Sequence, residues 1–336
     1  MLPAGIATYR SRRRALPNDT EGCQHVTLEH HGETATDQRV AAQLSAAWPG
    51  AERVRFRCVS EGAPHLADAT SKWLGVAGRR PAAFAVVSSR ASPMLVARGA
   101  ARAREVAQVV GPAAARAVAQ PVATGALLDG RSFMVSPFFT ALPRGRLLDR
   151  ITFPLLRPHV YSWLAELAVH SAAPPSAEHT SRTERELLGL VGLADLPDEI
   201  AIRARVALRR LRDGRYVPRA VITHGDLWPG NIMFAPEPRE VPWVHRFVVI
   251  DWAGAELDGH PFMDLVRSVL NLRVGGRAAR QVFGRYADAM QVSAQSASDH
   301  LVAGLARGLA TLEHFPLRSF RLLSHEMVMT LARAGL

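Results

Sequence analysis

The chain has 336 residues, of which 48% are hydrophobic and 21% are charged, and its formal net charge is +11. This length and composition exclude a disordered chain and allow one two-lobed domain, or two domains, with sizeable cores. No apolar stretch reaches the roughly 18 residues that would span a bilayer, and no apolar segment follows the basic residues near the N-terminus. We therefore expect no membrane partner, no secretory signal and a cytoplasmic location.

Almost all of the positive charge comes from arginine, since Lys72 is the only lysine. The sequence has no basic stripe interleaved with aromatic residues and no motif that reads DNA or RNA, so we expect no nucleic-acid partner. A basic balance favours anionic ligands, among which nucleotide phosphates are the obvious candidate. The two cysteines, Cys23 and Cys58, are too few for a disulfide framework and are expected to be reduced thiols.

The first part of the chain is predicted to be rich in strands. Residues 1–50 show little pattern apart from a helix-like stretch at 36–48, and we treat them as an N-terminal extension of unknown role. From residue 51 to 142, one helix is expected at 101–110, and short apolar or alternating runs predict strands at 54–59, 84–87, 94–97, 118–128 and 132–139. The runs 84–87 and 94–97 are predicted to form a hairpin, and Asp129-Gly130 is the expected turn between the last two.

After a turn-rich joint at 140–145, helices dominate the predicted structure. They are expected at about 154–173 and 183–213 and, at the end of the chain, near 262–274, 277–291, 297–313 and 319–334. Two short apolar runs between these groups, 231–234 and 247–250, predict strands. The sequence therefore predicts an α+β protein with a strand-rich N-terminal lobe at 51–142 and a helical C-terminal lobe at 143–336.

The most informative segment runs from Val221 to Phe234 and is followed by Asp251 at the end of an apolar run. Asp226 is placed to accept a hydrogen bond from a substrate hydroxyl and later its proton. Asn231 and Asp251 offer the hard oxygen donors that Mg²⁺ prefers. This arrangement is typical of phosphoryl transfer, which needs a positioned nucleophile, bound phosphates and a cation that meets the developing charge.

Three nearby residues are expected to support this loop. His224 is predicted to shape it by hydrogen bonding, and Gly225 by leaving room for the backbone. Asp264, near the start of a predicted helix, is expected either to cap that helix or to accept hydrogen bonds from the loop.

The chain resembles the aminoglycoside phosphotransferase and choline kinase family, a branch of the protein-kinase-like fold, in His224-Gly-Asp-Leu-Trp-Pro-Gly-Asn231, Ile250-Asp-Trp252 and Pro261-Phe-Met-Asp-Leu265. The resemblance implies a bilobal enzyme that uses Mg²⁺ to move the γ-phosphoryl group of ATP, or of another nucleoside triphosphate, to a hydroxyl. It implies that Asp226 is the catalytic base, Asn231 and Asp251 the metal ligands, and Asp264 a structural acid. The match is strong over 221–266, loose over 84–173 and absent for 1–50.

Kinase-like folds usually carry a lysine on the third strand, where it contacts the α- and β-phosphates, and this chain has none there. The run 94–97 is predicted to be that strand, which puts Arg98 at the lysine's place with Glu105 as the nearest candidate partner. Arginine binds phosphate through a longer, planar fork, so the exchange is not conservative. We therefore expect Arg98 and Glu105 to contact the nucleotide in an active enzyme, and the alternative is a non-catalytic scaffold module.

The charge of the C-terminal helices bears on the acceptor. Residues 267–336 contain four acids and nine arginines, a balance that disfavours a polycationic acceptor. A hydroxyl of a small metabolite or natural product fits better. The alternative acceptor is a Ser or Thr of a precursor peptide in natural-product biosynthesis, because the chain also resembles kinases that work with a partner lyase on such peptides.

Overall fold

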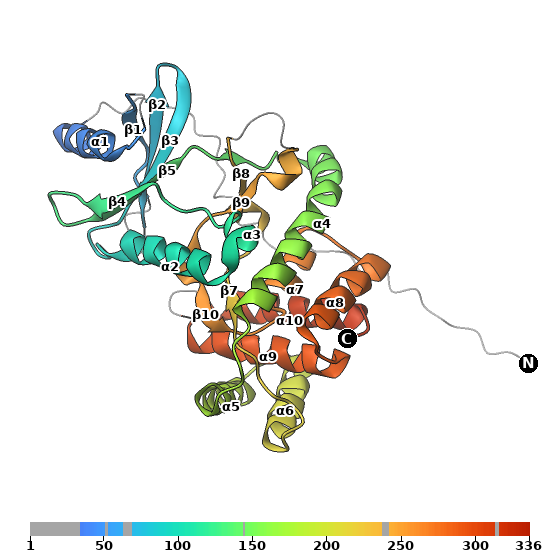
Figure 1. Cartoon of the computed structure of the whole chain (residues 1–336). Helices are drawn as coiled ribbons and strands as arrows, with labels where there is room; N and C mark the ends of the chain where they lie inside the picture. The colour runs from blue at the N-terminus through green and yellow to red at the C-terminus, as the bar shows by residue number, and fades with distance from the viewer. Residues whose placement is uncertain (1–33, 51–52, 63–68, 144, 237–241, 313–315) are drawn as a thin grey trace, which may run out of the picture.

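The computed structural model describes residues 34–50, 53–62, 69–143, 145–236, 242–312 and 316–336. They form two lobes, one built on an antiparallel sheet and a larger one built of helices (Figure 1). The predicted α+β architecture, with its strand-rich N-terminal and helical C-terminal lobes, is confirmed. None of the helices that the structure describes has both the length and the hydrophobicity of a membrane span.

The sheet of the N-terminal lobe has the strand order β1-β2-β3-β5-β4, with all neighbours antiparallel. Its strands are β1 (Arg55–Ser60), β2 (Ser71–Ala77), β3 (Arg80–Val87), β4 (Ala123–Ala126) and β5 (Ser132–Pro137). Alternate residues of β3 are buried, as the two-residue period of a strand requires, and they share a core with Val40 and Leu44 of helix α1 (Ala35–Ala47). The predicted turn at Asp129-Gly130 joins β4 to β5, and Gly130 adopts a φ of +83° there.

Helix α1 begins within the expected N-terminal extension. Thr34 and Asp37 form a capping box, in which the Thr34 hydroxyl accepts from Asp37 N at 3.1 Å and Asp37 Oδ2 accepts from Thr34 N at 3.1 Å. Residues 1–33, which include Cys23, lie outside the described part. Cys58 on β1 is a free, half-buried thiol, as expected.

Helix α2 (Leu95–Val109) corrects the prediction for its region. The expected strand at 94–97 is wrong, and so is its hairpin with 84–87, because 84–87 belongs to β3, which pairs with β2 and β5. The apolar residues continue at helical spacing, and Val96, Ala100, Ala103 and Val106 are buried on one face. Arg98 therefore lies on a helix and not on a strand.

Two buried serines cap the start of α2 from the sheet. Ser88 Oγ, just after β3, accepts from Val96 N at 3.0 Å, and Ser132 Oγ, on β5, accepts from Ala97 N at 3.1 Å. The two hydroxyls also bond to each other at 2.7 Å. These bonds satisfy N–H groups that a helix start otherwise leaves without partners.

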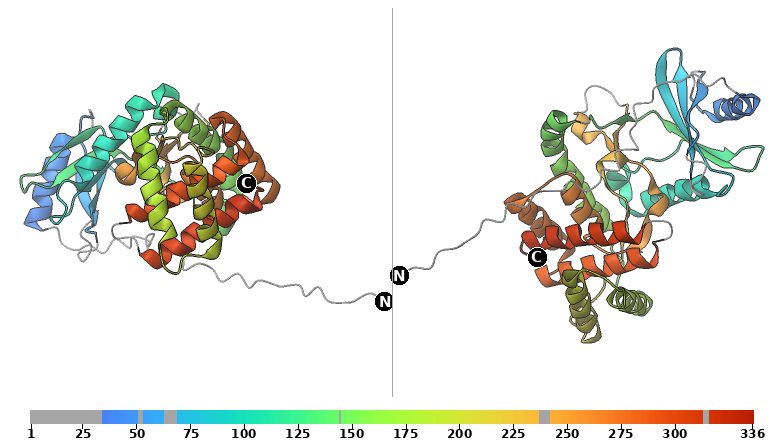
Figure 2. Two further views of the ribbon diagram at one scale, coloured as in Figure 1. Left: turned by 90° about the horizontal axis from the view of Figure 1, so that it is seen from below. Right: turned by 180° about the vertical axis from the view of Figure 1, so that it is seen from behind.

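Helix α2 also contacts the second lobe. It lies between the sheet and the helical body in all three views (Figures 1 and 2). A Cβ on Gly99 would lie 3.3 Å from the Cβ of Ala253, so the absence of a side chain lets the helix approach this segment closely. Ala103 and Val106 belong to the core of the second lobe, as does Ala114 of the short helix α3 (Gly111–Ala115).

The second lobe differs from its prediction in one helix. The expected helix at 183–213 is two helices, α5 (Ala177–Val191) and α6 (Asp198–Arg212), separated by a segment that contains Gly192 and Pro197. The remaining helices are α4 (Arg146–Ser171), α7 (Met263–Asn271), α8 (Gly276–Met290), α9 (Ala294–Ala310) and α10 (Leu317–Arg333). The short strands are β6 (Thr140–Ala141), β7 (Val221–Thr223), β8 (Ile232–Phe234), β9 (Phe247–Val249) and β10 (Glu256–Gly259), and the 3-10 turns are η2 (Pro229–Asn231), η3 (Trp243–His245) and η4 (Trp252–Gly254).

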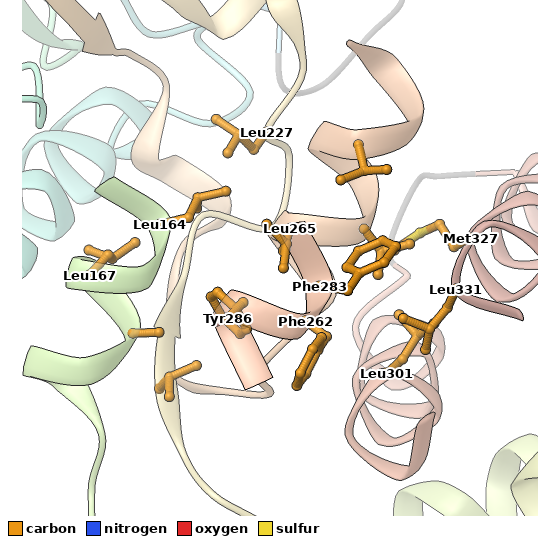
Figure 3. Close-up of a cluster of buried hydrophobic side chains, with 14 of the residues drawn as sticks. Leu164, Leu167, Leu227, Phe262, Leu265, Phe283, Tyr286, Leu301, Met327 and Leu331 are labelled. Carbon is orange, nitrogen blue, oxygen red and sulfur yellow. The ribbon is translucent and has the colours of Figure 1, made fainter. Parts of the chain in front are cut away.

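The core of this lobe extends from helix α4 to helix α10. Figure 3 shows buried side chains of α4, α7, α8, α9 and α10 around Phe262 and Phe283. Leu227 joins the same core and is fully buried, although it lies in the loop between β7 and η2. The loop is thereby anchored to the helices by an apolar residue.

Besides His224, three histidines are buried among the described residues of this lobe. The rings of His179 and His260 lie 5.0 Å apart, and His300 Nδ1 lies 3.3 Å from the Tyr216 hydroxyl. Neither ring nitrogen of His260 has a hydrogen-bond partner among the described residues. Burial lowers the pKa of all three imidazoles, that of His300 to about 3.

These histidines predict a loss of stability in acid. Because each pKa is lower in the folded chain than its ordinary value of 6.5, the unfolded chain binds more protons below that pH. The free energy of unfolding should therefore be largest above pH 6.5 and fall between pH 6.5 and 5.5, by at most about 1 kcal/mol for each histidine. Urea unfolding at these two pH values measures the loss. His260→Gln should reduce it, and His170→Gln, at an exposed site, should not; a pH-independent wild type would contradict the prediction.

Candidate active site

Strand β7 leads into a loop that glycine geometry shapes. Its three residues are buried, and Ile222 N donates to Ser171 Oγ of α4 at 2.9 Å. Gly225 then adopts a φ of +77°, and a Cβ there would lie 3.0 Å from Gly254 O. Both the left-handed conformation and this close approach require glycine. The chain turns sharply here and leaves Asp226 half-buried.

Asp264 holds this turn from the first turn of α7. Its Oδ2 accepts from His224 N at 2.5 Å, and its Oδ1 accepts from Gly225 N at 3.0 Å. Burial raises the pKa of the Asp264 carboxyl, and His224 and the two N–H donors oppose that rise. Phe262 is the N-cap residue of α7, and no side chain caps the helix there. Of the two predicted roles of Asp264, the structure shows hydrogen bonds to the loop and not a cap on its own helix.

His224 connects the loop to the strand that precedes Asp251. Its Nε2 lies 2.9 Å from Ile250 O, and its Nδ1 accepts from Asp226 N at 3.2 Å. A neutral ring satisfies both contacts only with its proton on Nε2. The ring also meets Trp252 edge to face, with centroids 4.8 Å apart. The structure therefore places His224 as a residue that orients the loop.

Asn231 contacts Asp226 directly. Its Nδ2 donates to Asp226 O at 2.9 Å and to Asp226 Oδ2 at 3.1 Å. The 3-10 turn η2 sets this position, since Asn231 N donates to Trp228 O at 2.9 Å. With the amide nitrogen engaged in this way, the amide oxygen of Asn231 is left to accept or to bind a cation.

Asp251 follows the end of β9, the strand that pairs with the segment after Asn231. Ile250 N donates to Asn231 O at 2.9 Å, at the end of the ladder in which Ile232 pairs with Val249. Asp251 itself is exposed and adopts the left-handed conformation, with φ and ψ both 63°. A non-glycine residue in this region is strained, and such strain is a recurrent feature of functional sites. Buried Trp252, whose Nε1 donates to Val249 O at 2.8 Å, secures the turn.

The donor atoms of Asn231 and Asp251 fit Mg²⁺. An amide oxygen and a carboxylate are hard ligands, and Mg²⁺ in phosphate-handling sites is commonly held by one or two protein groups, with phosphates and water as the other ligands. The described residues contain no group of three or more His, Cys, Asp or Glu side chains that could hold a metal alone. The amide and carboxylate oxygens thus suit an Mg²⁺ ion whose other ligands are phosphate and water oxygens.

Arg267 is a site residue that the sequence analysis missed. Its Nη2 forms an ion pair with Asp226 Oδ1, and its Nη1 donates to Gly225 O at 2.9 Å. Asp264 and Arg267 are three residues apart on α7, so one face of this helix supplies both a carboxylate and a guanidinium group to the loop. That spacing was the available signal in the sequence.

The expected nucleotide contacts are arranged differently from the prediction. Glu105 pairs with Arg102 at 2.9 Å, one turn away on α2, and not with Arg98. Arg98 is exposed and precedes Gly99, the residue that meets Ala253 of η4. The third strand, β3, carries no lysine, and the buried residue after its end is Ser88, which caps α2. The structure therefore keeps Arg98 near the segment after Asp251 but gives it no Glu105 partner.

Comparisons with known proteins agree with this geometry. A model described as the phosphotransferase enzyme family matches residues 64–295, which include the whole loop and Asp251. No protein of curated function matches the sequence significantly.

Among solved structures, the chain is similar to a thermostable mutant of the aminoglycoside phosphotransferase APH(4)-Ia, with 12% identity, coverage of 89% of this chain and 99% of that chain, and a TM-score of 0.53. It is also similar to a choline kinase from Streptococcus pneumoniae, with 12% identity, coverage of 89% and 99%, and a TM-score of 0.48. At 12% identity the likeness to the aminoglycoside phosphotransferase concerns the fold, and the predicted kinase-like bilobal architecture is confirmed.

Proposed function

The chain belongs to the phosphotransferase enzyme family and is a phosphotransferase with an alcohol group as acceptor, and from this premise we propose that it transfers the γ-phosphoryl group of ATP to a hydroxyl of a small metabolite or natural product. Asp226 is the catalytic base in this proposal, and Asn231 and Asp251 are the metal ligands. His224 and Asp264 hold the loop in position.

The observation that carries the proposal is the contact of Asn231 with Asp226, together with the backbone bond that joins Asn231 to the residue before Asp251. Asn231 bonds to both the backbone and the carboxylate of Asp226, and its own backbone oxygen is bonded by the residue before Asp251. Asp226 would orient the acceptor hydroxyl and accept its proton as the new O–P bond forms. Bound Mg²⁺ would neutralise phosphate charge during transfer. The complete set supports catalysis over a non-catalytic scaffold.

Arg98 and Glu105 remain proposed contacts on the nucleotide side. Arg98 is exposed at the start of α2, one residue before the contact with η4, so its guanidinium can reach phosphates held next to Asp251. Glu105 would act indirectly, because its carboxylate is engaged by Arg102.

Acceptor-dependent release of ADP tests the proposed function. With Mg²⁺-ATP and a panel of hydroxylated compounds, we expect ADP release above the rate without acceptor and one phosphorylated product for each ADP. Chelation of Mg²⁺ by EDTA should stop the reaction. Phosphate release that never depends on an acceptor would sink the proposal. A precursor-peptide substrate predicts transfer to Ser or Thr of an acidic peptide and no transfer to small alcohols.

A further inference from the structure

Trp228 is a large aromatic residue that stays exposed inside the catalytic loop. It lies between Asp226 and Asn231 in sequence, and 40% of its surface is exposed, whereas its neighbours Leu227 and Pro229 are buried. An indole normally contributes most when it is buried against other groups. Its exposure beside the catalytic aspartate indicates that its partner arrives from outside the chain.

Gly230 holds the indole in one orientation. A Cβ on Gly230 would lie 2.2 Å from Cη2 and 2.4 Å from Cζ2 of Trp228, so the six-membered ring rests against the Gly230 backbone. The backbone beneath it is fixed in turn, because Asn231 N bonds to Trp228 O. The ring is therefore supported by the loop on one side and presented to solvent on the other. The Trp228 side chain loses little conformational freedom when a ligand stacks on it, so binding costs little side-chain entropy.

Three carboxylates on the elements next to the loop already have partners. Strand β10 pairs with β7 just before the loop and carries Glu256 and Asp258. Glu256 accepts from Arg307 of α9 at 2.9 Å, and Asp258 forms an ion pair with Arg182 of α5. Asp264 is engaged by the loop backbone. A polycationic acceptor would have to displace arginines or main-chain donors from these three acids, which disfavours ammonium groups as the feature that is recognised.

Resting on the proposed function, we propose that Trp228 determines acceptor specificity, with its exposed face binding a flat, uncharged ring that carries the reacting hydroxyl. The apolar face of a sugar or an aromatic ring has the chemistry that an indole face attracts. The acceptor oxygen bonds to the γ-phosphorus and gives its proton to Asp226, while the bond from the γ-phosphorus to the bridging oxygen breaks and that oxygen leaves with the nucleoside diphosphate.

The test compares ring acceptors with acyclic ones in the ADP-release assay. Methyl glucopyranoside and benzyl alcohol serve as rings, glycerol and sorbitol as acyclic alcohols, and kanamycin as a polycation. We expect Trp228→Leu to lower kcat/KM for the preferred ring acceptor at least tenfold more than for the acyclic alcohols. This factor corresponds to about 1.4 kcal/mol. Trp228→Phe should retain most of the preference, since it keeps an aromatic face.

Two more variants separate stacking from general damage. Gly230→Ala should move the indole and reproduce the ring-specific loss with the aromatic group still present. Trp243→Leu removes an indole that packs on Phe234 and should leave the ratio of ring to acyclic activity unchanged. Equal losses on both acceptor classes, or kanamycin as the best acceptor, would overturn the role of Trp228 while phosphotransfer itself stands. Absence of acceptor-dependent ADP release from every compound would overturn both proposals.

Discussion

Replacing Asp226 by Asn should lower kcat for phosphoryl transfer by about 100-fold or more, the usual contribution of a positioned general base. The substitution keeps the side chain's size and still offers an oxygen to Asn231, so the loop should hold its shape. It removes the group that accepts the acceptor's proton and also the negative partner of Arg267. Steady-state ADP release with saturating Mg²⁺-ATP and acceptor measures the effect.

A matched control is available for this variant. Asp288→Asn makes the same chemical change at an exposed position of α8 and should leave kcat within twofold of the wild type, about the scale expected for a remote surface change. If Asp226→Asn retained a third or more of wild-type kcat, Asp226 would not be the base, and the proton would have to leave by another route.

Replacing Asp264 by Ala should lower the free energy of unfolding by about 2–4 kcal/mol. The carboxylate accepts from the N–H groups of His224, which is buried, and of Gly225, which is exposed. Its removal should cost about 1–3 kcal/mol for the buried donor and about 1 kcal/mol for the exposed one. Asp264→Asn should cost less, because an amide oxygen can still accept from one of the two. Urea unfolding followed by circular dichroism gives the values.

The control for Asp264 tests the competing explanation, that this acid stabilises its helix by acting on the helix dipole. Asp198 also lies in the first turn of a helix, α6, and is exposed. Asp198→Ala should cost no more than about 1 kcal/mol, the scale of a charge at a helix end. Similar losses in the two variants would show that Asp264 acts on α7 and does not hold the loop.

The catalytic loop could be predicted because its chemistry is local in sequence. Asp226 and Asn231 are five residues apart, and Asp251 follows a short strand, so residue types and spacing alone predict a magnesium-dependent phosphoryl-transfer site. The contact between Asp226 and Asn231 is confirmed, and the roles of the three residues stay predictions. Arg267 was missed because its contact with Asp226 joins residues 41 positions apart. The three-residue spacing of Asp264 and Arg267 places both on one face of α7, but that face points to the loop only because Asp264 accepts from the loop backbone.

Helix α2 shows why the N-terminal lobe was harder to predict. A four-residue apolar run such as 94–97 fits a strand or a helix equally well, and periodicity does not separate the two at that length. The start of the helix depends on Ser88 and Ser132, whose hydroxyls accept from helix N–H groups. These groups lie 8 and 35 positions away from the two serines in the sequence. Because a strand was predicted here, Arg98 was expected on a strand, whereas it lies on α2.

Helix α2 is held by two contacts, and they affect how the enzyme can be controlled. Its start is fastened to β3 and β5 by the serine hydroxyls, and Gly99 sits directly against the segment that follows Asp251. A helix fastened in this manner cannot swing outward as a separate body without breaking its own cap. We therefore expect the active site to be permanently assembled. The reaction rate should then depend on the concentrations of the two substrates and not on a signal that switches the enzyme on or off.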